Sequence, residues 1–201
     1  MIPQHELTGL ILAGGQGRRM GGVDKGLVSF AGRPLVAHVR ERLAGRVAEV
    51  LINANRSLAA YGEFADRVVE DAEGGYQGPL MGIYSGLRAA TTPWLVVVPC
   101  DTPALPEDLV ARLVAGLGEA DIAVACDGER LHPVVALIRT ALADDLGAAL
   151  AGGERKIDRW YARHAWCRVD VSDCPAAFAN LNTDDDKRRL EQALHGEPAN
   201  R

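Results

Sequence analysis

The sequence predicts an α/β protein with a mostly parallel central sheet and helices on both of its faces. Short apolar runs alternate with segments of helical periodicity, which is the order of elements in such folds. The apolar runs are continuous, as expected for strands that are buried on both faces of a sheet. The chain has 201 residues, 48% of them hydrophobic, which is enough to bury one core. We expect a single domain over residues 1–195 and a frayed tail at 196–201.

The expected elements follow from these patterns in chain order. The apolar runs predict strands at Leu7–Ala13, Val47–Asn53, Trp94–Pro99, Ile122–Cys126 and Val134–Ile138. The helical patterns cover Pro34–Ala44, Gly82–Ala90, Pro106–Leu117, Thr140–Ala151 and Thr183–Leu194. Pro34 and Pro106 suit the first turns of their helices, where a missing N–H costs no hydrogen bond. Asp127-Gly128 between two strands predicts a hairpin-like turn.

Composition and charge exclude several classes of protein. The formal net charge of −5 gives no indication of a nucleic-acid surface. No apolar run is long enough for a membrane span, and the N-terminus does not resemble a signal peptide. The four cysteines have no C-x-x-C spacing, which indicates reduced thiols. These features predict a cytoplasmic protein.

A glycine-rich loop follows the first strand. It runs from Gly14 to Lys25 and carries Arg18 and Arg19. Glycines let backbone N–H groups approach a polyanion, and arginine and lysine donate to phosphate oxygens. The loop lacks the Lys-Ser/Thr of a P-loop and the third glycine of a dinucleotide fingerprint. It therefore predicts a different phosphate-binding loop, with an ordinary flexible loop as the alternative.

Polar or glycine residues stand at the ends of three of these apolar runs and after a further short segment, Val68-Val69-Glu70. They are Gly14, Gly15, Asn53, Asp71 and Asp101. Because ligands of open α/β sheets bind beyond the carboxyl ends of the strands, we expect these residues to share one site. Asp101 is the candidate ligand for Mg²⁺, which prefers oxygen atoms and binds together with phosphates. The alternative for Asp101 is a turn or a helix cap.

Several of these residues suit a nucleobase. The amides of Asn53 and Asn55 can each donate and accept, and the carboxylate of Asp71 matches the ring N–H and amino group of guanine. The bare segment Gly78-Pro79-Leu80 could lie flat against the base. Alternatively, Asn53 is a turn residue, Asp71 is solvated and the segment is merely a helix entry.

A second substrate has its own candidate residues. His132 is held extended by the following proline, and Lys156 belongs to a short basic segment. Asn180 and Asn182 share one face of an extended segment, with Leu181 pointing into the core. Each also has a structural alternative: a structural histidine, a solvated helix start and polar surface positions.

These residues occur together in an order that resembles a known family. The blocks are Leu12-Ala13-Gly14-Gly15, Arg18-Arg19-Met20-Gly21, Asp24-Lys25, Asn53-Ala54-Asn55-Arg56, Glu70-Asp71, Gly78-Pro79-Leu80, Pro99-Cys100-Asp101-Thr102-Pro103, Asp127-Gly128-Glu129-Arg130, His132-Pro133 and Asn180-x-Asn182-Thr183. From Leu7 to Leu194 the chain closely resembles the molybdenum cofactor guanylyltransferases.

The resemblance implies a Rossmann-like nucleotidyltransferase fold and a specific reaction. GMP would pass from GTP to the terminal phosphate of molybdenum-loaded molybdopterin, with release of pyrophosphate. By position, the resemblance assigns Leu12, Ala13, Gly14, Asn53 and Asp71 to the nucleotide, and Lys25 and Arg19 to its phosphates. It assigns Asp101 to Mg²⁺, and Asn180 and Asn182 to the pterin.

Two other functions stay open at this point. One is a cytidylyltransferase acting on molybdopterin or another small phosphate acceptor. The other is a regulator that binds a nucleotide without catalysis, which has no evident need for Asp101. Transient complexes with other cofactor-biosynthesis or acceptor proteins are expected, because the product must be handed over.

Overall fold

Seven strands form the main sheet, with β1 and β6 near its centre. The computed structural model describes residues 2–14, 24–73, 78–181, 186 and 188. The strand order is β5-β4-β1-β6-β8-β7-β9. The bounds are β1 (Leu7–Leu12), β4 (Glu49–Asn53), β5 (Arg67–Val69), β6 (Trp94–Pro99), β7 (Ile122–Cys126), β8 (Leu131–Arg139) and β9 (Trp166–Asp170). β8 is antiparallel to both neighbours and the other pairings are parallel, so the predicted, mostly parallel sheet is confirmed.

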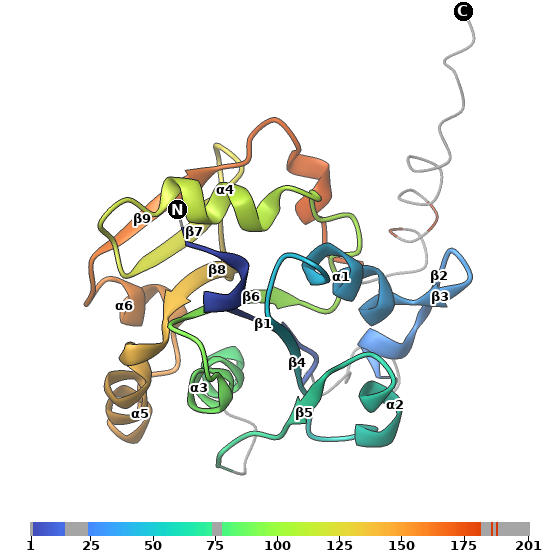
Figure 1. Ribbon diagram of the computed structural model, residues 1–201, viewed down its shortest axis with the longest axis horizontal. Coiled ribbons are helices and arrows are strands. Elements are labelled where there is room, and N and C mark those ends of the chain that lie inside the picture. The colour runs from blue at the N-terminus through green and yellow to red at the C-terminus, as the bar shows by residue number, and fades with distance from the viewer. Residues whose placement is uncertain (1, 15–23, 74–77, 182–185, 187, 189–201) are drawn as a thin grey trace, which may run out of the picture.

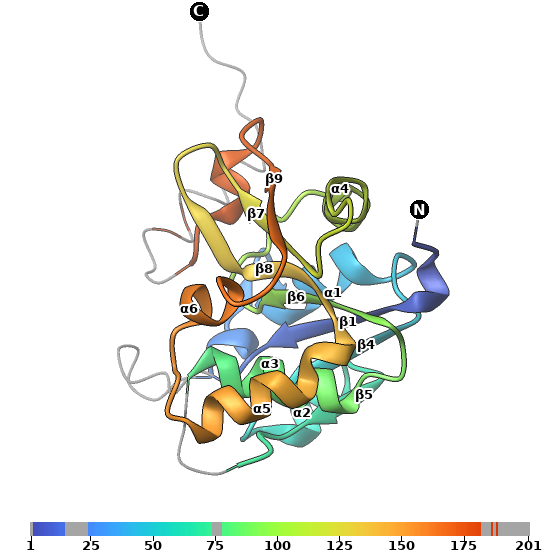
Figure 2. The same ribbon diagram turned by 90° about the vertical axis from the view of Figure 1, so that its left-hand side faces the viewer.

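Helices cover both faces of this sheet (Figures 1 and 2). α1 (Leu35–Leu43) and α4 (Leu109–Gly116) lie on one face, and α3 (Pro79–Ala89) and α5 (Ala143–Ala151) lie on the other. Along β6, Val96 packs in the core on the α1 and α4 face, and Val97 packs in the core on the α3 and α5 face. Both side chains are fully buried. This explains why the strand is apolar at every position. No helix in the described ranges is both long and apolar enough to cross a membrane.

The helix starts differ from the sequence expectation. Pro34 pairs with Ser29 in a small hairpin of β2 (Ser29–Phe30) and β3 (Arg33–Pro34), so it precedes α1 rather than opening it. Pro106 also lies before its helix, which begins at Leu109. Pro79 instead occupies the first turn of α3, three residues ahead of the predicted start.

Some elements were not predicted, and one prediction falls largely outside the described residues. The short helices α2 (Leu58–Gly62) and α6 (Ile157–Tyr161), the β2–β3 hairpin and the edge strand β9 were missed. Residues 140–151 form a 3₁₀ turn (Thr140–Leu142) followed by α5. Of the helix predicted at 183–194, residues 186 and 188 are described and are helical. The single domain stays a prediction, and the tail at 196–201 lies outside the described residues.

The turn between β7 and β8 has the predicted hairpin form. Gly128 has a φ of 93°, which a residue without a Cβ adopts readily. The Asp127 N–H donates to the carbonyl of Arg130 at 3.0 Å, and Asp127 Oδ1 accepts the N–H groups of Glu129 and Arg130. The turn brings the start of β8 to the carboxyl end of β6.

Candidate active site

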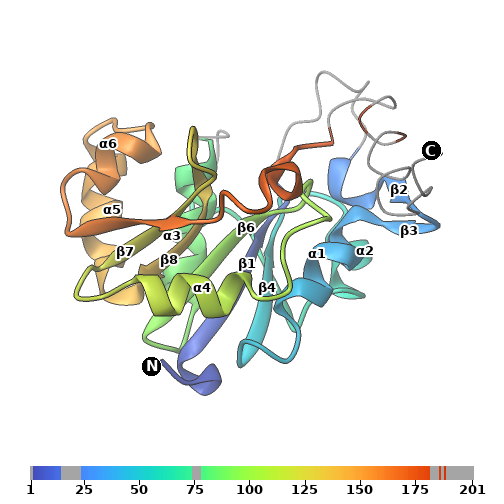
Figure 3. The ribbon, with the colours of Figure 1, turned by 90° about the horizontal axis from the view of Figure 1, so that it is seen from above.

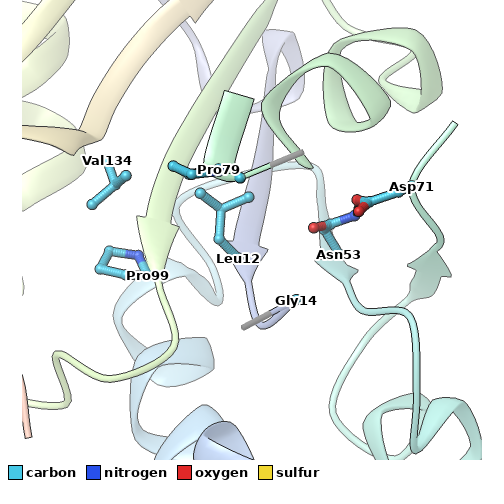
Figure 4. A pocket seen from close by; sticks show the side chains of 8 residues that line it. Leu12, Gly14, Asn53, Asp71, Pro79, Pro99 and Val134 are labelled. Atoms are coloured by element: carbon cyan, nitrogen blue, oxygen red, sulfur yellow. The ribbon is translucent and has the colours of Figure 1, made fainter. Parts of the chain in front are cut away.

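A cavity of about 180 Å³ lies where β1, β4 and β6 end. Parallel strands of an open α/β sheet present their ligand sites at this edge. The lining residues, seen in Figure 4, are Leu12, Gly14, Asn53, Asp71, Gly78, Pro79, Pro99 and Val134. The first six are among the residues that the sequence predicted for nucleotide binding.

The carboxylate of Asp71 is held at the cavity wall by two amides. Nδ2 of Asn53 donates to Asp71 Oδ1 at 3.0 Å, and Nδ2 of Asn55 donates to Asp71 Oδ2 at 2.8 Å. The Asn55 side chain also accepts the backbone N–H of Asp71 at 2.8 Å. Each carboxylate oxygen can accept more than one hydrogen bond, so both keep capacity for a ligand. Figure 4 shows Asn53 and Asp71 adjacent on one side of the cavity.

Asn53 holds other groups in place and is itself almost completely buried. Its Nδ2 also donates to the carbonyl of Val69 at 3.2 Å, which leaves no spare N–H on this amide. A Cβ at Gly14 would lie 3.2 Å from Asn53 Oδ1, so the glycine backbone approaches the amide closely. The role that the structure shows for Asn53 is therefore to join β4, β5 and the loop after β1.

Lys25 and Asp101 form an ion pair just beyond the end of β6. Lys25 Nζ lies 2.5 Å from Asp101 Oδ2, and the two side chains are 23% and 14% exposed. The other oxygen, Asp101 Oδ1, is buried and has no hydrogen-bond partner within the described residues. Since an unsatisfied buried oxygen is costly, this atom is suited to a cation that arrives with the substrate. Pro99, two residues before Asp101, lines the cavity.

Cys100 lies between these residues but is a poor nucleophile. Its side chain is buried in the core. Burial raises the pKa of the Cys100 thiol well above its ordinary range, and the neighbouring charge of Asp101 raises it further. The thiol therefore stays protonated, and it packs as an apolar group.

Two predicted nucleotide-site residues belong to the core. Leu80 is fully buried, it packs with residues of α3 and α5, and it is not among the residues that line the cavity. Ala13 is also buried, and its N–H donates to the carbonyl of Asn53 at 2.9 Å. Gly15 and Arg19 lie outside the described residues.

His132 is paired with residues of its own region. Its Nε2 lies 2.9 Å from Asp127 Oδ2, and its ring stacks on Phe178 at 4.7 Å between centroids. The Arg130 backbone N–H and the His132 ring hold the pKa of Asp127 below its ordinary value. His132 is therefore oriented, partly buried and anchored to the segment that precedes Asn180.

That segment passes the end of β6. The N–H of Leu181 donates to the carbonyl of Asp101 at 3.0 Å. Leu181 is buried, as predicted, and Asn180 beside it is exposed. Figure 3 shows the C-terminal segment (red) above the ends of the central strands, on the side opposite the N-terminus. The structure thus brings His132 and Asn180 to the Asp101 side of the cavity; Asn182 lies outside the described residues.

Lys156 is exposed at the start of α6. Its N–H donates to Glu154 Oε1 at 2.9 Å. The hydroxyl of Tyr161, at the other end of α6, donates to the carbonyl of Pro133 at 2.8 Å. α6 therefore packs beside Pro133, which follows His132. In Figure 3 it lies on the side of the sheet opposite the N-terminus, as the C-terminal segment does.

Two residues of the site were not among the predicted ones, because Pro99 and Val134 line the cavity. The amide of Asn55 was predicted together with that of Asn53 to suit a nucleobase or ribose, and in the structure it holds Asp71. Pro99 and Val134 read as ordinary apolar strand residues, so only the fold reveals their position.

Comparison with known proteins identifies the family. The family model of the MobA-like NTP transferase domain matches residues 9–167. The molybdenum cofactor guanylyltransferase of Shewanella pealeana is 47% identical over 194 residues, covering 96% of this chain and 97% of its own. That of Shewanella amazonensis is 49% identical over 190 residues, covering 94% and 97%. The chain belongs to the molybdenum cofactor guanylyltransferase family. It is therefore a nucleotidyltransferase, as the resemblance implied.

Solved structures share the fold of this family member. A structure from Archaeoglobus fulgidus, described as molybdopterin-guanine dinucleotide biosynthesis protein A, matches with a TM-score of 0.76 at 24% identity, covering 94% of this chain and 98% of that one. The 2-C-methyl-D-erythritol 4-phosphate cytidylyltransferase of Thermus thermophilus matches with a TM-score of 0.71 at 17% identity, covering 93% and 98%. At such identities the likeness shows the Rossmann-like nucleotidyltransferase fold alone.

Proposed function

We propose that this enzyme transfers GMP from GTP to the terminal phosphate of molybdenum-loaded molybdopterin. Pyrophosphate leaves, and the guanine dinucleotide form of the cofactor results. The observation that carries the proposal is the cavity at the strand ends, with the Asp71 carboxylate in its wall and the Lys25–Asp101 pair two residues beyond the lining residue Pro99. The names of the relatives support the choice of acceptor.

Asp71 is the proposed guanine-recognition residue. Guanine presents a ring N–H and an amino group side by side, and a carboxylate can accept from both. Asn53 and Asn55 fix the plane of this carboxylate before the base arrives. Cytosine has no such pair of donors, which favours GTP over CTP. Leu12, Gly14, Gly78 and Pro79 would form the apolar and bare surfaces around the base.

Lys25, Arg19 and Asp101 are the proposed phosphate and metal residues. Asp101 Oδ1 fits Mg²⁺, because this hard cation often binds through one carboxylate together with phosphate oxygens. No cluster of three or more His, Cys, Asp or Glu side chains with metal-binding geometry occurs in the described ranges, which agrees with a site completed by the substrate. When bound, Mg²⁺ would neutralise charge on the triphosphate and on the departing pyrophosphate.

The chemistry requires positioning more than proton transfer. The terminal phosphate of molybdopterin is already an anion at neutral pH, so it needs no dedicated general base. One of its oxygens would attack the α-phosphorus of GTP, and the bond from that phosphorus to the bridging oxygen of pyrophosphate would break. Lys25 and Arg19 would stabilise the negative charge that develops on the leaving group. The barrier also falls because two anions are held together in the correct orientation.

The acceptor is proposed to bind on the Asp101 side of the cavity. His132 and Asn180 lie there, and Lys156 and Asn182 complete the proposed acceptor set. The Asp127 carboxylate and the Phe178 ring orient His132, so its imidazole can serve as a fixed hydrogen-bonding group. Cationic Lys156 would attract the anionic pterin phosphate.

We also infer a cytoplasmic location and transient complexes with proteins that supply or collect the cofactor. All four cysteines are free thiols, which fits a reducing compartment. No role in binding nucleic acid is proposed.

Pyrophosphate release from GTP or CTP, measured with and without molybdenum-loaded molybdopterin, tests the proposed function. The expected result is release that requires both GTP and molybdopterin. Preference for CTP would support the cytidylyltransferase alternative. No release with either nucleotide would support the non-catalytic regulator.

A further inference from the structure

Tyr61 is fully buried, although its hydroxyl is polar. It lies on α2, which follows a sharp turn at Ser57, where φ is 52°. The Tyr61 hydroxyl donates a hydrogen bond to Asp24 Oδ1 at the end of the glycine-rich loop. Burial raises the pKa of Tyr61 far above its ordinary value, and the bond to Asp24 raises it further. The hydroxyl is therefore a permanent donor to Asp24.

The second oxygen of Asp24 forms an ion pair with the same part of the chain. Asp24 Oδ2 is buried, accepts no hydrogen bond within the described residues and lies 3.4 Å from Nε of Arg56. Asp24 in turn begins the 3₁₀ turn Lys25–Leu27, whose Leu27 N–H donates to the Asp24 carbonyl at 3.0 Å. The position of Asp24 thus sets where this turn starts.

The Tyr61 ring also packs against Gly26, the residue that follows Lys25. A Cβ built on Gly26 would lie 2.6 Å from the Tyr61 oxygen and 3.1 Å from its Cε1. Such contacts are too short for a real side chain, so glycine is required against this ring. Tyr61 therefore contacts the residues immediately before and after Lys25.

We propose that Tyr61 is a positioning residue, which fixes the backbone of Lys25 through Asp24 and Gly26 and so directs the lysine ammonium to Asp101. Lys25 Nζ lies 2.5 Å from Asp101 Oδ2, and a small rotation of the 24–27 turn would move the long side chain off this point. Tyr61 is fully buried and is not among the residues that line the cavity, so we assign it no contact with substrate. The inference concerns Lys25 in its catalytic role and rests on the proposed function.

Tyr61→Phe is the decisive variant, because it removes the hydroxyl and keeps the ring against Gly26. We expect kcat for molybdopterin-dependent pyrophosphate release to fall about 10- to 100-fold, the size expected for a misplaced catalytic group, with KM for GTP changed less than about threefold. Gly26→Ala displaces the same turn from the opposite side, and we expect a similar kcat loss. Tyr84→Phe is the matched control: this tyrosine packs against Gly147, outside the site, and its variant keeps the wild-type kcat.

The combination with Lys25→Ala distinguishes positioning from a general structural role. If Tyr61 acts through Lys25, Tyr61→Phe lowers single-turnover transfer in the wild-type background and has no further effect in the Lys25→Ala background. An equal fold-loss in both backgrounds contradicts the proposal.

Amide hydrogen exchange gives a readout that does not depend on the reaction. The N–H groups of Leu27 and Val28 are hydrogen-bonded within the turn. We expect Tyr61→Phe to speed their exchange while the amides of β1 and β6 stay protected. Unchanged exchange at both positions overturns the inference. Wild-type protein that transfers no GMP overturns the proposed function instead, and the exchange result still decides the role of Tyr61.

Discussion

The two carboxylate oxygens of Asp101 have different surroundings. Oδ2 accepts a hydrogen bond from the Lys25 ammonium, whereas Oδ1 is buried without a hydrogen-bond partner in the described part of the chain. A folded protein rarely leaves such an oxygen unsatisfied unless a ligand completes it. Asp101 is therefore the residue at which Lys25, the proposed cation and both proposed substrates would meet.

Lys25→Ala is expected to lower kcat by about 100-fold or more. Its ammonium is proposed to stabilise charge that develops only as pyrophosphate leaves, and removal of one such group costs about 10²–10³ in other enzymes. Steady-state pyrophosphate release checks this expectation, together with circular dichroism to show that the variant is folded.

Arg33→Ala provides the control for the loss of a cation near the same loop. Arg33 pairs with Glu41 at 2.8 Å, and both side chains are about half exposed. An exposed pair contributes about 0–1 kcal/mol, so stability and kcat should both stay near wild type. A Lys25→Ala variant as active as Arg33→Ala would contradict the assigned role of Lys25.

At this scale the sequence predicted which residues matter better than what each one does. Asp71 and Asp101 could be predicted because both follow strand ends. The holding role of Asn53 could not, because its partner Asp71 lies 18 residues away and only the pairing of β4 with β5 brings them together. Tyr61 gave no signal, since a tyrosine in a short helical segment reads as an ordinary core residue.

α3 lines the cavity through Pro79, and two of its glycines face different neighbours. A Cβ on Gly82 would lie 2.4 Å from Asn53 Oδ1, at the amide that holds Asp71. A Cβ on Gly86 would lie 2.4 Å from Cδ2 of Leu10, in the core. A methyl group added at Gly82 therefore disturbs the site, whereas one added a turn later at Gly86 disturbs the core packing.

Gly82→Ala is expected to raise KM for GTP about tenfold, because the added methyl displaces Asn53 and loosens Asp71. Gly86→Ala is expected to lower the free energy of unfolding by about 1–3 kcal/mol through overpacking, with KM for GTP near wild type. Urea denaturation and steady-state kinetics on both variants check this. Equal KM values in the two variants would contradict the assignment of Asp71 to the nucleotide.

Asp145 on α5 joins α6 to the rest of the protein. It accepts hydrogen bonds from the Trp160 indole at 2.8 Å and from Arg163 at 2.9 Å, and it lies 3.1 Å from His164 Nε2. Burial acts to raise the pKa of Asp145, but the Trp160 N–H and the charges of Arg163 and His164 outweigh it and hold the pKa below 3.8. The ionised carboxylate thus stabilises the folded state.

Asp145→Asn is expected to cost about 1 kcal/mol of unfolding free energy at pH 6, a value reduced by the partial exposure of the group. Because the folded-state pKa is lowered, this contribution is present above pH 3.8 and is lost as pH falls through the folded-state pKa. The difference between wild type and variant should therefore shrink progressively as the pH falls below 3.8. Denaturation at pH 6 and pH 3 tests this, and a difference that grows in acid would be contrary to it.

The success of element prediction depended on burial. β6 was predicted to the residue, because both of its faces are covered and every position is apolar. β9 was missed because it lies at the sheet edge and carries exposed charged residues, Arg168 and Asp170, on either side of buried Val169. It therefore has no continuous apolar run. α2 has only five residues, too few for a helical period to show.

Across the whole molecule, the two proposed substrates would meet at the middle of the sheet. β1, β4 and β5 would supply the nucleotide side, whereas the β7–β8 hairpin and the segment before Asn180 would supply the acceptor side. Their common boundary would be Asp101, just beyond the end of β6. This follows from β8 running antiparallel to β6, because its start then lies beside that strand's end.

Binding of Mg²⁺ and GTP should stabilise the whole fold. A ligand at about 100 times its Kd adds about 2.7 kcal/mol, which corresponds to a rise of about 5–10 °C in Tm for a chain of this size. Differential scanning calorimetry with GTP or CTP at equal concentration measures this. A rise with CTP as large as with GTP would contradict the guanine selectivity assigned to Asp71.

The most direct measurement follows the α-phosphate of GTP. With GTP labelled at that phosphate, wild-type protein should transfer the label to molybdenum-loaded molybdopterin, and folded Asp101→Asn protein should transfer it about 100-fold more slowly or worse. Absence of labelled product with the wild type, or equal rates in the two proteins, would contradict the proposed reaction at this site.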